Sequence, residues 1–436
     1  MKLNISICAY DSIAAVSGPA SWLQRVPPAF LDAGHNVTVH LFWWENEKDG
    51  VLRGFLEREG ITFTSHQFST TERNVQALLN AVAARPPHIL IADNVIPALM
   101  AGRYLSAVGT QTIGIIRSDD AFYHAVIDTF AAGHAADRIR AFVAVSEFLG
   151  EEVRRRSRGE CCCRVIPSGA PIPAEQARWS ETEFQIVYSG RLVEEQKRII
   201  ETTQCMIRLC RDNDKVRCVI IGDGSMKEEV EQLARASGMP ISVVGRKSES
   251  EVQRILLQSQ ALLLLSDYEG TPTAVMEAMA CGVVPVCLAI RSGIPELVIH
   301  EKTGLIVHDR DGSCVSAFRS LAQSEDRWKQ LSAAARAHLE MSFSTQSCLQ
   351  RWISLLCDIS EGSAPKAIKV PCRLSLPPKH PGFRRQDNRE PTTIERLVAR
   401  SKQLLLRSRF HAGRLRRRIN GDTLPQMRVD VSEDVS

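Results

Sequence analysis

The chain has 436 residues, of which 44% are hydrophobic and 24% are charged, and its formal net charge is +4. At about 100–200 residues per domain this length allows two or three domains, and the composition is that of an ordinary soluble globular protein. No apolar run approaches about 18 residues, which excludes a membrane-spanning helix, and 13 Cys without any C-x-x-C pair argue against a disulfide framework.

Strand and helix patterns alternate from the beginning of the chain. Strands are expected at 3–10, 36–44, 62–68, 88–93, 112–117 and 141–146, separated by helices at 20–33, 47–59, 72–84, 97–107, 122–130 and 147–156. This βαβα order implies a parallel sheet that is covered by helices.

The segment 166–173 breaks this alternation, because it contains three Pro and one Gly and predicts a stiff connector. Strands then follow at 184–189, 217–221, 241–244, 261–265 and 283–287, with helices at 197–210, 226–236, 248–258, 272–281, 314–322, 325–340 and 345–359. We therefore expect Rossmann-like α/β domains at 1–168 and 183–340 and a Pro-rich linker at 169–182. A closing helix at 341–360 is expected to pack back toward the first domain.

Residues 361–436 form a basic tail, with 17 Lys and Arg against 8 Asp and Glu, a local charge of +9. Up to residue 391 the tail reads as an aperiodic linker, and beyond it apolar residues at helical spacing favour a basic amphipathic helix. We expect a peripheral contact with an anionic membrane and no nucleic-acid partner. A solvated tail is an alternative, as is a helix that packs on the domains or on a second copy. The apolar positions are Ile394, Leu397, Leu404, Leu405 and Leu415.

The N-terminus and the cysteines indicate the compartment. The short apolar stretch after Met1 is interrupted by Asp11, so we expect no signal peptide and a cytoplasmic protein with reduced thiols, associated with a membrane through its tail. The adjacent cysteines at 161–163 are interpreted as the inert start of a strand, and thiol reactivity or lipidation is the less favoured alternative.

Basic residues follow the first strand of the second domain. Gly190 at the end of this strand lets a ligand approach the backbone. Arg191 and Lys197 could then hold two phosphates, Arg through its planar fork and Lys as a point charge. Taken alone, a solvated Arg and Lys near a turn are the commoner explanation.

The next strand ends in a short glycine-containing loop, Gly222-Asp223-Gly224. Ligands of open α/β folds bind at the carboxyl ends of strands, which is where this loop lies. A G-x-G pattern by itself is often only a tight turn before a helix, so this loop supports a binding site only together with its neighbours.

The segment 266–282 has the strongest local pattern. Thr271 is expected to cap a helix whose first residue is Pro272, and Gly282 is expected to close it. The free N–H groups of Thr273 and Ala274 would then point out of a helix N-terminus, where a phosphate binds well.

Two carboxylates lie on either side of that helix start. Glu269 precedes the helix and Glu277 lies within it, a separation of about 12 Å at the helical rise. This separation is about the reach from a ribose across a diphosphate to a sugar. The alternative is that Glu277 lies among apolar residues by accident and faces solvent.

Taken together, these motifs make the sequence similar to a known family. It resembles the C-terminal domain of the family-4 (group 1) retaining glycosyltransferases in the order of its motifs, which are Gly190-Arg191-Leu192-x4-Lys197, Gly222-Asp223-Gly224, Gly245-Arg246, Glu269-x7-Glu277-Ala-Met-Ala-x-Gly282, Ser292-Gly-Ile-Pro-Glu296 and Thr303-Gly-Leu-Ile-Val307. The resemblance implies the GT-B fold, in which two Rossmann-like domains with parallel sheets face a central cleft. It also implies a first domain on the acceptor side and a second domain that binds the nucleotide sugar.

The resemblance further implies roles for individual residues. Arg191 and Lys197 would hold the diphosphate, Glu277 would bind the ribose hydroxyls, and Glu269 would contact the transferred sugar. The sugar would be transferred with retention of configuration from a nucleotide-diphosphate-sugar donor, with no cofactor and no obligatory metal. The remaining donor-binding positions would be Gly18, Gly190, Gly222, Gly224, Arg246, Thr273 and Ala274.

The first domain departs from the family pattern. Its first loop, Ser17-Gly18-Pro19-Ala20, has a single Gly, so only Gly18 is carried over. In place of the family's His after the fifth strand the chain has Asp119 and Asp120, and we expect Asp119 to orient the acceptor or the sugar. His124 is interpreted as structural.

Two other functions stay open. A donor-binding subunit without catalysis, supporting a partner transferase, is compatible with the weak glycine loop. A nucleotide-sugar epimerase of the same fold would need acid and base residues at the sugar, and the Glu-x7-Glu pattern argues against it. The donor base, its sugar, the acceptor and the oligomeric state are not specified by the sequence.

Overall fold

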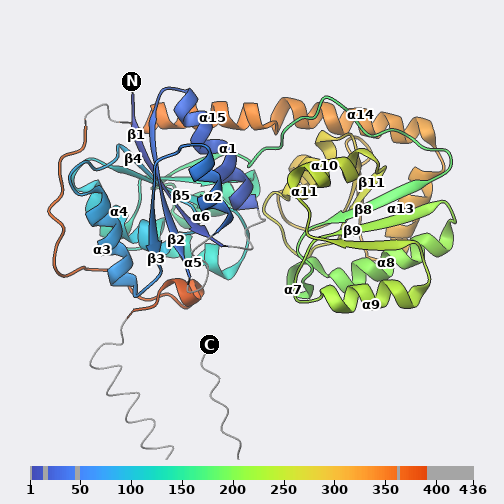
Figure 1. Ribbon diagram of the computed structural model, residues 1–436, viewed down its shortest axis with the longest axis horizontal. Helices are drawn as coiled ribbons and strands as arrows, with labels where there is room; N and C mark the ends of the chain where they lie inside the picture. Colours follow the sequence, from blue (N-terminus) through green and yellow to red (C-terminus); the bar gives the residue numbers. More distant parts are fainter. Residues whose placement is uncertain (1, 13–17, 45–49, 361–363, 390–436) are drawn as a thin grey trace, which may run out of the picture. The chain divides into compact units, whose positions relative to one another are not determined.

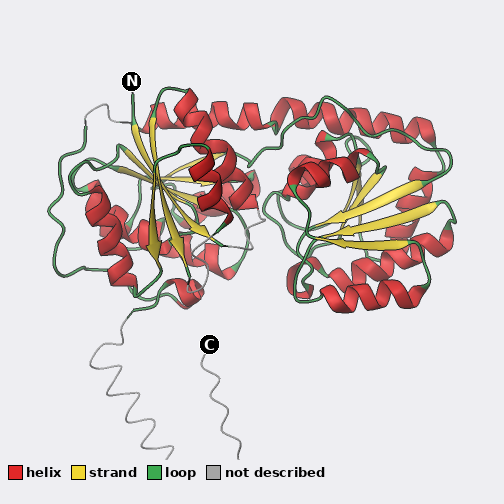
Figure 2. Cartoon of the chain, viewed as in Figure 1, coloured by secondary structure: helices red, strands yellow, loops and turns green. Residues whose placement is uncertain are grey.

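The structure is a computed structural model that describes residues 2–12, 18–44, 50–360 and 364–389. The fold is built on two parallel β-sheets (Figure 1). Each has helices on both faces (Figure 2), as the βαβ alternation requires. This is the GT-B architecture expected from the sequence. The described residues up to Asn388 belong to one compact unit.

The first sheet has seven strands in the order β3-β2-β1-β4-β5-β6-β7. Its register pairs Ile7 with Val39 and Ile91. The strands are β1 (Asn4–Asp11), β2 (Asn36–Trp43), β3 (Phe63–Gln67), β4 (Ile89–Ala92), β5 (Gln111–Ile116), β6 (Ala141–Ala144) and β7 (Cys162–Val165). The last of these was expected only as a strand start.

Two apolar cores cover the faces of this sheet, one containing Leu23, Phe30 and Trp352 and the other Val75, Leu99 and Phe130. Helix α15 packs on the first face, where Trp352 contacts Trp22 at a ring distance of 5.4 Å. The helices of this part are α1 (Gly18–Asp32), α2 (Val51–Arg58), α3 (Thr71–Val82), α4 (Ile96–Ser106), α5 (Ala121–Phe130), the short η1 (Ala135–Asp137), α6 (Glu147–Arg156) and α15 (Thr345–Ile359).

The second sheet has six strands in the order β10-β9-β8-β11-β12-β13. The strands are β8 (Phe184–Ser189), β9 (Val216–Ile221), β10 (Ile241–Gly245), β11 (Ala261–Leu264), β12 (Val284–Leu288) and β13 (Leu305–Val307). Its helices are α7 (Glu194–Lys197), α8 (Ile199–Asp212), α9 (Lys227–Ser237), α10 (Glu249–Leu257), α11 (Thr273–Ala280), α12 (Ile294–Leu297), α13 (Gly312–Ala322) and α14 (Glu325–Ser342).

The helix expected at 197–210 is split by one residue. Arg198 adopts φ 48° and ψ 47°, in the left-handed region, and so separates α7 from α8. A residue with a Cβ is disfavoured there because that atom crowds the carbonyl oxygen, whereas glycine has no Cβ.

The segment 364–388, which we call the strap, was expected to be a linker but packs on the first sheet's helices. Figure 1 shows it passing outside α4 and α3 and ending in the short helix η2 (Pro381–Gln386) beside α5. Phe383 is fully buried and stacks on Phe130 at 6.0 Å. Periodicity could not reveal this, because the strap has no regular helix or strand pattern and is held by contacts with distant parts of the chain.

Among the described residues no helix is both long and apolar enough to cross a bilayer. The boundaries expected for the domains, and the closing helix as a separate element, stay predictions.

Candidate active site

The order of the second sheet reverses between β8 and β11. β8 is flanked by β9 on one side and β11 on the other, so the loops that leave β8 and β11 diverge at their carboxyl ends. Such a switch point is where open α/β sheets bind ligands. The loop after β8 leads to Arg191 and Lys197, and the loop after β11 holds Glu269, so the topology brings the predicted residues to one place.

Lys197 and Glu269 form a buried ion pair. Lys197 Nζ lies 2.5 Å from Glu269 Oε1, and the side chains are 13% and 7% exposed. A buried charge is costly unless an opposite charge compensates it. The cation predicted to bind phosphate and the carboxylate predicted to face the sugar therefore neutralise each other in this structure.

Arg191 reaches the same loop through a residue that sequence reasoning missed. Its exposed guanidinium donates to Gln196 Oε1 at 2.5 Å, and Gln196 Nε2 donates to the Tyr268 carbonyl at 2.9 Å. Gln196 is 7% exposed and so has to satisfy its amide inside the protein. No sequence signal marked it, because a Gln in a helix is usually solvated.

The glycines of the two adjacent loops have a packing role. A Cβ on Gly222 would lie 1.8 Å from the Gly190 carbonyl oxygen, and one on Gly224 would lie 2.4 Å from the Leu192 oxygen. Leu192 N–H also donates to the Asp223 carbonyl oxygen at 2.9 Å. The loop after β9 therefore supports the loop that carries Arg191 by close backbone approach.

Arg246 follows the edge strand β10 and is exposed. In the described part of the chain no hydrogen bond or ion pair joins it to another residue. The structure does not connect it with the group formed by Arg191, Lys197 and Glu269.

The start of α11 differs from the expectation. Thr271 does not cap the helix, because its hydroxyl donates to the Val145 carbonyl at 2.5 Å, and Pro272 is the N-cap. The expected capping by Thr271 is therefore wrong, since a partner on β6's loop competes for the hydroxyl. Thr273 and Ala274 still begin the helix, and Gly282 ends it with φ 75°.

Two helix N-termini approach each other at this point. A Cβ on Gly18, the first residue of α1, would lie 3.0 Å from Thr273 Oγ1 at the start of α11. Helix N-termini carry partial positive charge and free N–H groups, which favour an anion. Residues 13–17 of the first loop lie outside the described residues.

Glu277 is half-buried in α11, and its carboxyl group accepts no hydrogen bond from a described residue. Burial raises the pKa of Glu277 to about 7, nearby Arg25 opposes this, and Glu249 adds to it. Arg25 comes from α1, donates to the Gly169 carbonyl at 3.2 Å and pairs with Glu249 at 3.0 Å. Glu277 is thus a carboxyl group with free acceptor capacity, not a solvated surface residue.

Asp119 lies in the loop that follows β5 of the first sheet. Asp119 Oδ1 lies 2.6 Å from His124 Nε2, so the structure joins these two residues as a pair. Asp120 caps α5 instead, accepting from the N–H groups of Phe122 and Tyr123 at 3.0 and 3.1 Å. Of the two acidic residues, Asp119 is the one whose side chain is not used by the backbone.

A second buried ion pair closes the ends of β4 and β5. Arg117 binds Asp93 through two hydrogen bonds of 2.8 and 3.0 Å, and its guanidinium lies 5.1 Å from the Trp22 ring centroid. Sequence reasoning missed this pair, although both residues ended expected neighbouring strands. It fixes the backbone from which Asp119 projects.

The loops of the second sheet touch this region closely. A Cβ on Gly270 would lie 2.0 Å from the Arg117 carbonyl oxygen. Glu296 accepts from the N–H groups of Glu147 and Phe148 at 2.9 and 3.1 Å and so caps α6. Burial raises the pKa of Glu296, and these two bonds oppose it. The motif Ser292–Glu296 thus links the two halves of the fold.

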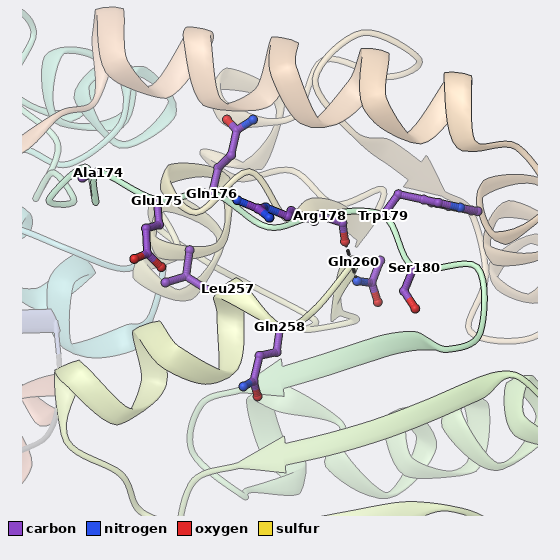
Figure 3. Close-up of a pocket in the computed structure, with 9 residues that line it drawn as sticks. All are labelled: Ala174, Glu175, Gln176, Arg178, Trp179, Ser180, Leu257, Gln258 and Gln260. Atoms are coloured by element: carbon purple, nitrogen blue, oxygen red, sulfur yellow. Dashed lines mark hydrogen bonds between the residues drawn. The ribbon is translucent and has the colours of Figure 1, made fainter.

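No group of three or more His, Cys, Asp or Glu in the described ranges could hold a metal ion. A separate hollow of about 740 Å³ lies between residues 174–180, in the segment that joins the two sheets, and the end of α10. Figure 3 shows Leu257 and Gln258 on one side of it and Glu175 and Arg178 on the other. None of its lining residues belongs to the candidate active site.

Comparison with known proteins finds a family model that matches part of the chain. Residues 173–338 match the family described as group 1 glycosyl transferases. The chain resembles this family over those residues, which make up less than half of its length. The amylovoran biosynthesis glycosyltransferase AmsK of Erwinia amylovora is 29% identical over 182 residues, which are 40% of this chain and 44% of AmsK.

Another relative matches over a similar share of the chain. The N-acetyl-alpha-D-glucosaminyl L-malate synthase of Bacillus anthracis is 26% identical over 37% of this chain and 42% of its own length. The chain thus spans less than half the length of these curated relatives.

Solved structures share the fold over most of the chain. The pneumococcal O-GlcNAc transferase GtfA, solved with UDP and GlcNAc, has a TM-score of 0.68 at 11% identity and covers 83% of this chain and 99% of its own. Anabaena HepE, solved with UDP and glucose, has a TM-score of 0.66 at 16% identity and covers 82% and 100%. These identities support the GT-B fold alone.

Proposed function

We propose that the chain transfers a sugar from a nucleotide-diphosphate donor to an acceptor, with retention of anomeric configuration and without an obligatory metal. The observation that carries this proposal is the Lys197–Glu269 pair at the switch point of the second sheet, beside Arg191 and the N-terminus of α11. The two side chains can give up their mutual contact when a ligand offers an anion to Lys197 and hydroxyl groups to Glu269.

Donor cleavage would build negative charge on the β-phosphate and positive charge on the sugar ring. Lys197 would turn from Glu269 to the phosphate, assisted by Arg191 and the N–H groups at the start of α11. Fixed positive groups aimed at a developing anion contribute several kcal/mol to catalysis. Glu269, released from Lys197, would face the sugar ring, where its charge opposes the developing positive charge.

Glu277 would accept the ribose hydroxyls, because it is the carboxyl group with free acceptor capacity at this helix. Gly18, Gly190, Gly222 and Gly224 would let the backbone approach the donor, and Asp119 with His124 would orient the acceptor or the sugar. The relatives named above differ in the molecules that their names mention, amylovoran and L-malate, so the acceptor class stays open.

The test is a panel of nucleotide sugars, screened by thermal shift and then by nucleotide release. We expect one donor to stabilise the protein and to release nucleoside diphosphate slowly in water and faster with the right acceptor. Tight binding with no release under any condition indicates a donor-binding subunit. Conversion of the donor into another nucleotide sugar indicates an epimerase. A product with inverted anomeric configuration by NMR contradicts retention.

Metal independence has its own test. Activity is expected to persist in EDTA. A complete loss in EDTA that Mn²⁺ restores contradicts the proposed use of Lys197, Arg191 and the helix N-terminus in place of a metal.

A further inference from the structure

The strap lies outside the two sheets that define the fold. The solved structures are matched over 99–100% of their lengths while covering 82–83% of this chain, so part of this chain has no counterpart in them. The strap is nevertheless tied to the first sheet's helices at several points. Lys366 and Ile368 donate their N–H groups to the Val108 and Ala83 carbonyls at 3.0 Å, and Tyr104 Oη donates to the Ser375 carbonyl at 2.9 Å.

The strap has two chemically different sides. Its apolar side chains are half-buried against the core that contains α3 and α4, and Phe383 anchors its end. Its basic side chains point to solvent. The apolar positions are Ile368, Val370, Leu374 and Leu376, and the exposed basic positions are Lys366, Lys369, Arg373, Lys379 and Arg384.

No carboxylate neutralises these cations within the described part of the chain. None of the exposed basic positions of the strap forms an ion pair there. The strap's one acidic residue, Asp387, is 1% exposed and accepts from Thr71 Oγ1 at 3.1 Å. Arg73 on α3 and Arg85 just after it are exposed as well. Uncompensated charge of one sign on one face creates a field that selects partners of the opposite sign.

We propose that the outward side of the strap is a docking surface for the anionic headgroups of a lipid bilayer, so that α3 and α4 lie on the membrane side of the first domain. Proteins that bind single-stranded nucleic acid stack bases on aromatic side chains, and the strap's one Phe is buried. The chain also continues beyond the strap with another 10 Lys and Arg in residues 390–436, interspersed with Leu. Basic and apolar residues in combination are typical of interfacial binding.

The first experiment measures binding of the full chain to vesicles by sedimentation. Vesicles that contain phosphatidylglycerol are expected to bind the protein and pure phosphatidylcholine vesicles are not. The double substitution Lys369→Ser and Arg373→Ser is expected to weaken binding by about fivefold per charge removed, and raised salt is expected to weaken it further. The matched control is Arg211→Ser with Lys302→Ser, which removes two exposed, unpaired charges from the other sheet's part and is expected to leave binding unchanged.

The second experiment needs no substitution. Cys372 on the strap and Cys357 on α15 are both exposed. Vesicle binding is expected to slow maleimide labelling at Cys372 severalfold and to leave Cys357 unchanged, as read by mass spectrometry of the labelled peptides.

Three results overturn the proposal. In the first, the strap variant and the control variant bind phosphatidylglycerol vesicles equally well. Another is bound protein whose Cys372 is labelled as fast as in solution. The third is tighter binding to single-stranded oligonucleotides than to the vesicles at the same salt concentration, which assigns the basic surface to nucleic acid. Each readout is independent of donor turnover, so a failure here leaves the proposed transferase function untouched.

Discussion

Arg191 and Lys197 were assigned the same role, yet the structure gives them different surroundings. Arg191 is exposed and bonded to a neutral amide, whereas Lys197 neutralises the buried Glu269. Arg191→Ala is therefore expected to leave the fold intact and to lower turnover at least tenfold, a loss of more than about 1.4 kcal/mol. Turnover and thermal melting of this variant are compared with Lys302→Ala as a surface control. Near-normal turnover in Arg191→Ala removes it from the phosphate site.

Lys197→Ala has an additional cost, because it leaves a buried carboxylate without its partner. Removing one member of a buried ion pair typically costs about 3–5 kcal/mol. Loss of turnover in this variant therefore means little unless its free energy of unfolding is measured beside it.

The two glutamates are expected to fail in different ways. Glu277 would contact the ribose equally in the ground and transition states, so Glu277→Gln is expected to raise the donor dissociation constant more than it lowers kcat. Glu269 would act where positive charge develops, so Glu269→Gln is expected to lower kcat more than donor affinity. Calorimetry and steady-state kinetics on both variants provide the comparison. The opposite pattern reverses the two roles, and no change in either quantity rejects the assignment of this motif.

The raised pKa of Glu277 predicts a pH dependence of donor binding. Its folded pKa of about 7 lies above the ordinary value of 4.5, so the folded protein holds the extra proton between these values. The stabilising effect of that proton is complete below pH 4.5 and is lost as the pH rises through about 7. Donor hydroxyls bind the ionised carboxylate, so affinity is expected to increase from pH 6 to pH 8 and to level off above about pH 8.

Glu277→Gln is the control for this pH dependence, because its amide does not titrate. Its donor affinity is expected to be flat over the same pH range. A wild-type profile as flat as that of the variant contradicts the raised pKa or the ribose contact.

At the scale of elements, the regular βαβ pattern was enough to predict most of the helices and strands. Central strands such as Ile89–Ala92 and Ala261–Leu264 are continuous apolar runs, and parallel sheets buried on both faces require such runs. Helix ends marked by Ser, Thr or Asp were also located closely, as at Ser248 with its capping box. The first helix is followed by Gly34 at φ 85°, in the left-handed region that glycine commonly adopts after a helix.

What failed at this scale depends on contacts between distant residues. Thr271 looks like a helix cap in the sequence, but the Val145 carbonyl, 126 positions away, takes its hydroxyl. The left-handed backbone at Arg198 could not be predicted, because the residue there is not a glycine. At the site, the residue types and their loops were predictable, whereas the pairing of Lys197 with Glu269 and the link through Gln196 were not, because only the tertiary structure sets those distances.

The strap provides a prediction at this scale. Phe383 is fully buried and contacts rings on α5, and Phe→Ala in a core costs about 3–5 kcal/mol. Phe383→Ala is therefore expected to let the whole strap open. Hydrogen exchange at the Lys366 and Ile368 amides, which donate to Val108 and Ala83, is expected to accelerate by at least tenfold while the strand amides stay protected.

Lys379→Ala is the control for the strap, because this exposed residue lies close to Phe383 in sequence without sharing its burial. Its exchange at Lys366 and Ile368 is expected to equal that of the wild type. Unchanged exchange in Phe383→Ala shows that the strap is held segment by segment and not by its end.

For the whole molecule, the sequence divides into a part that resembles other GT-B proteins and a basic C-terminal part that follows it. Residues 361–436 hold a local charge of +9 and the rest a local −5. The proposed donor site lies on loops of the second sheet, whereas the strap packs on the helices of the first. The two functions assigned to these parts are therefore expected to be separable.

Deleting residues 392–436 tests this separation. Basic residues near an anionic surface contribute about 1 kcal/mol each, so the deletion is expected to weaken binding to phosphatidylglycerol vesicles at low salt. Binding is not expected to vanish, because the strap retains its five exposed basic residues. Donor affinity by calorimetry is expected to equal that of the full chain. Unchanged vesicle binding means that the residues beyond 391 serve another purpose, and a changed donor affinity means that they reach the donor site.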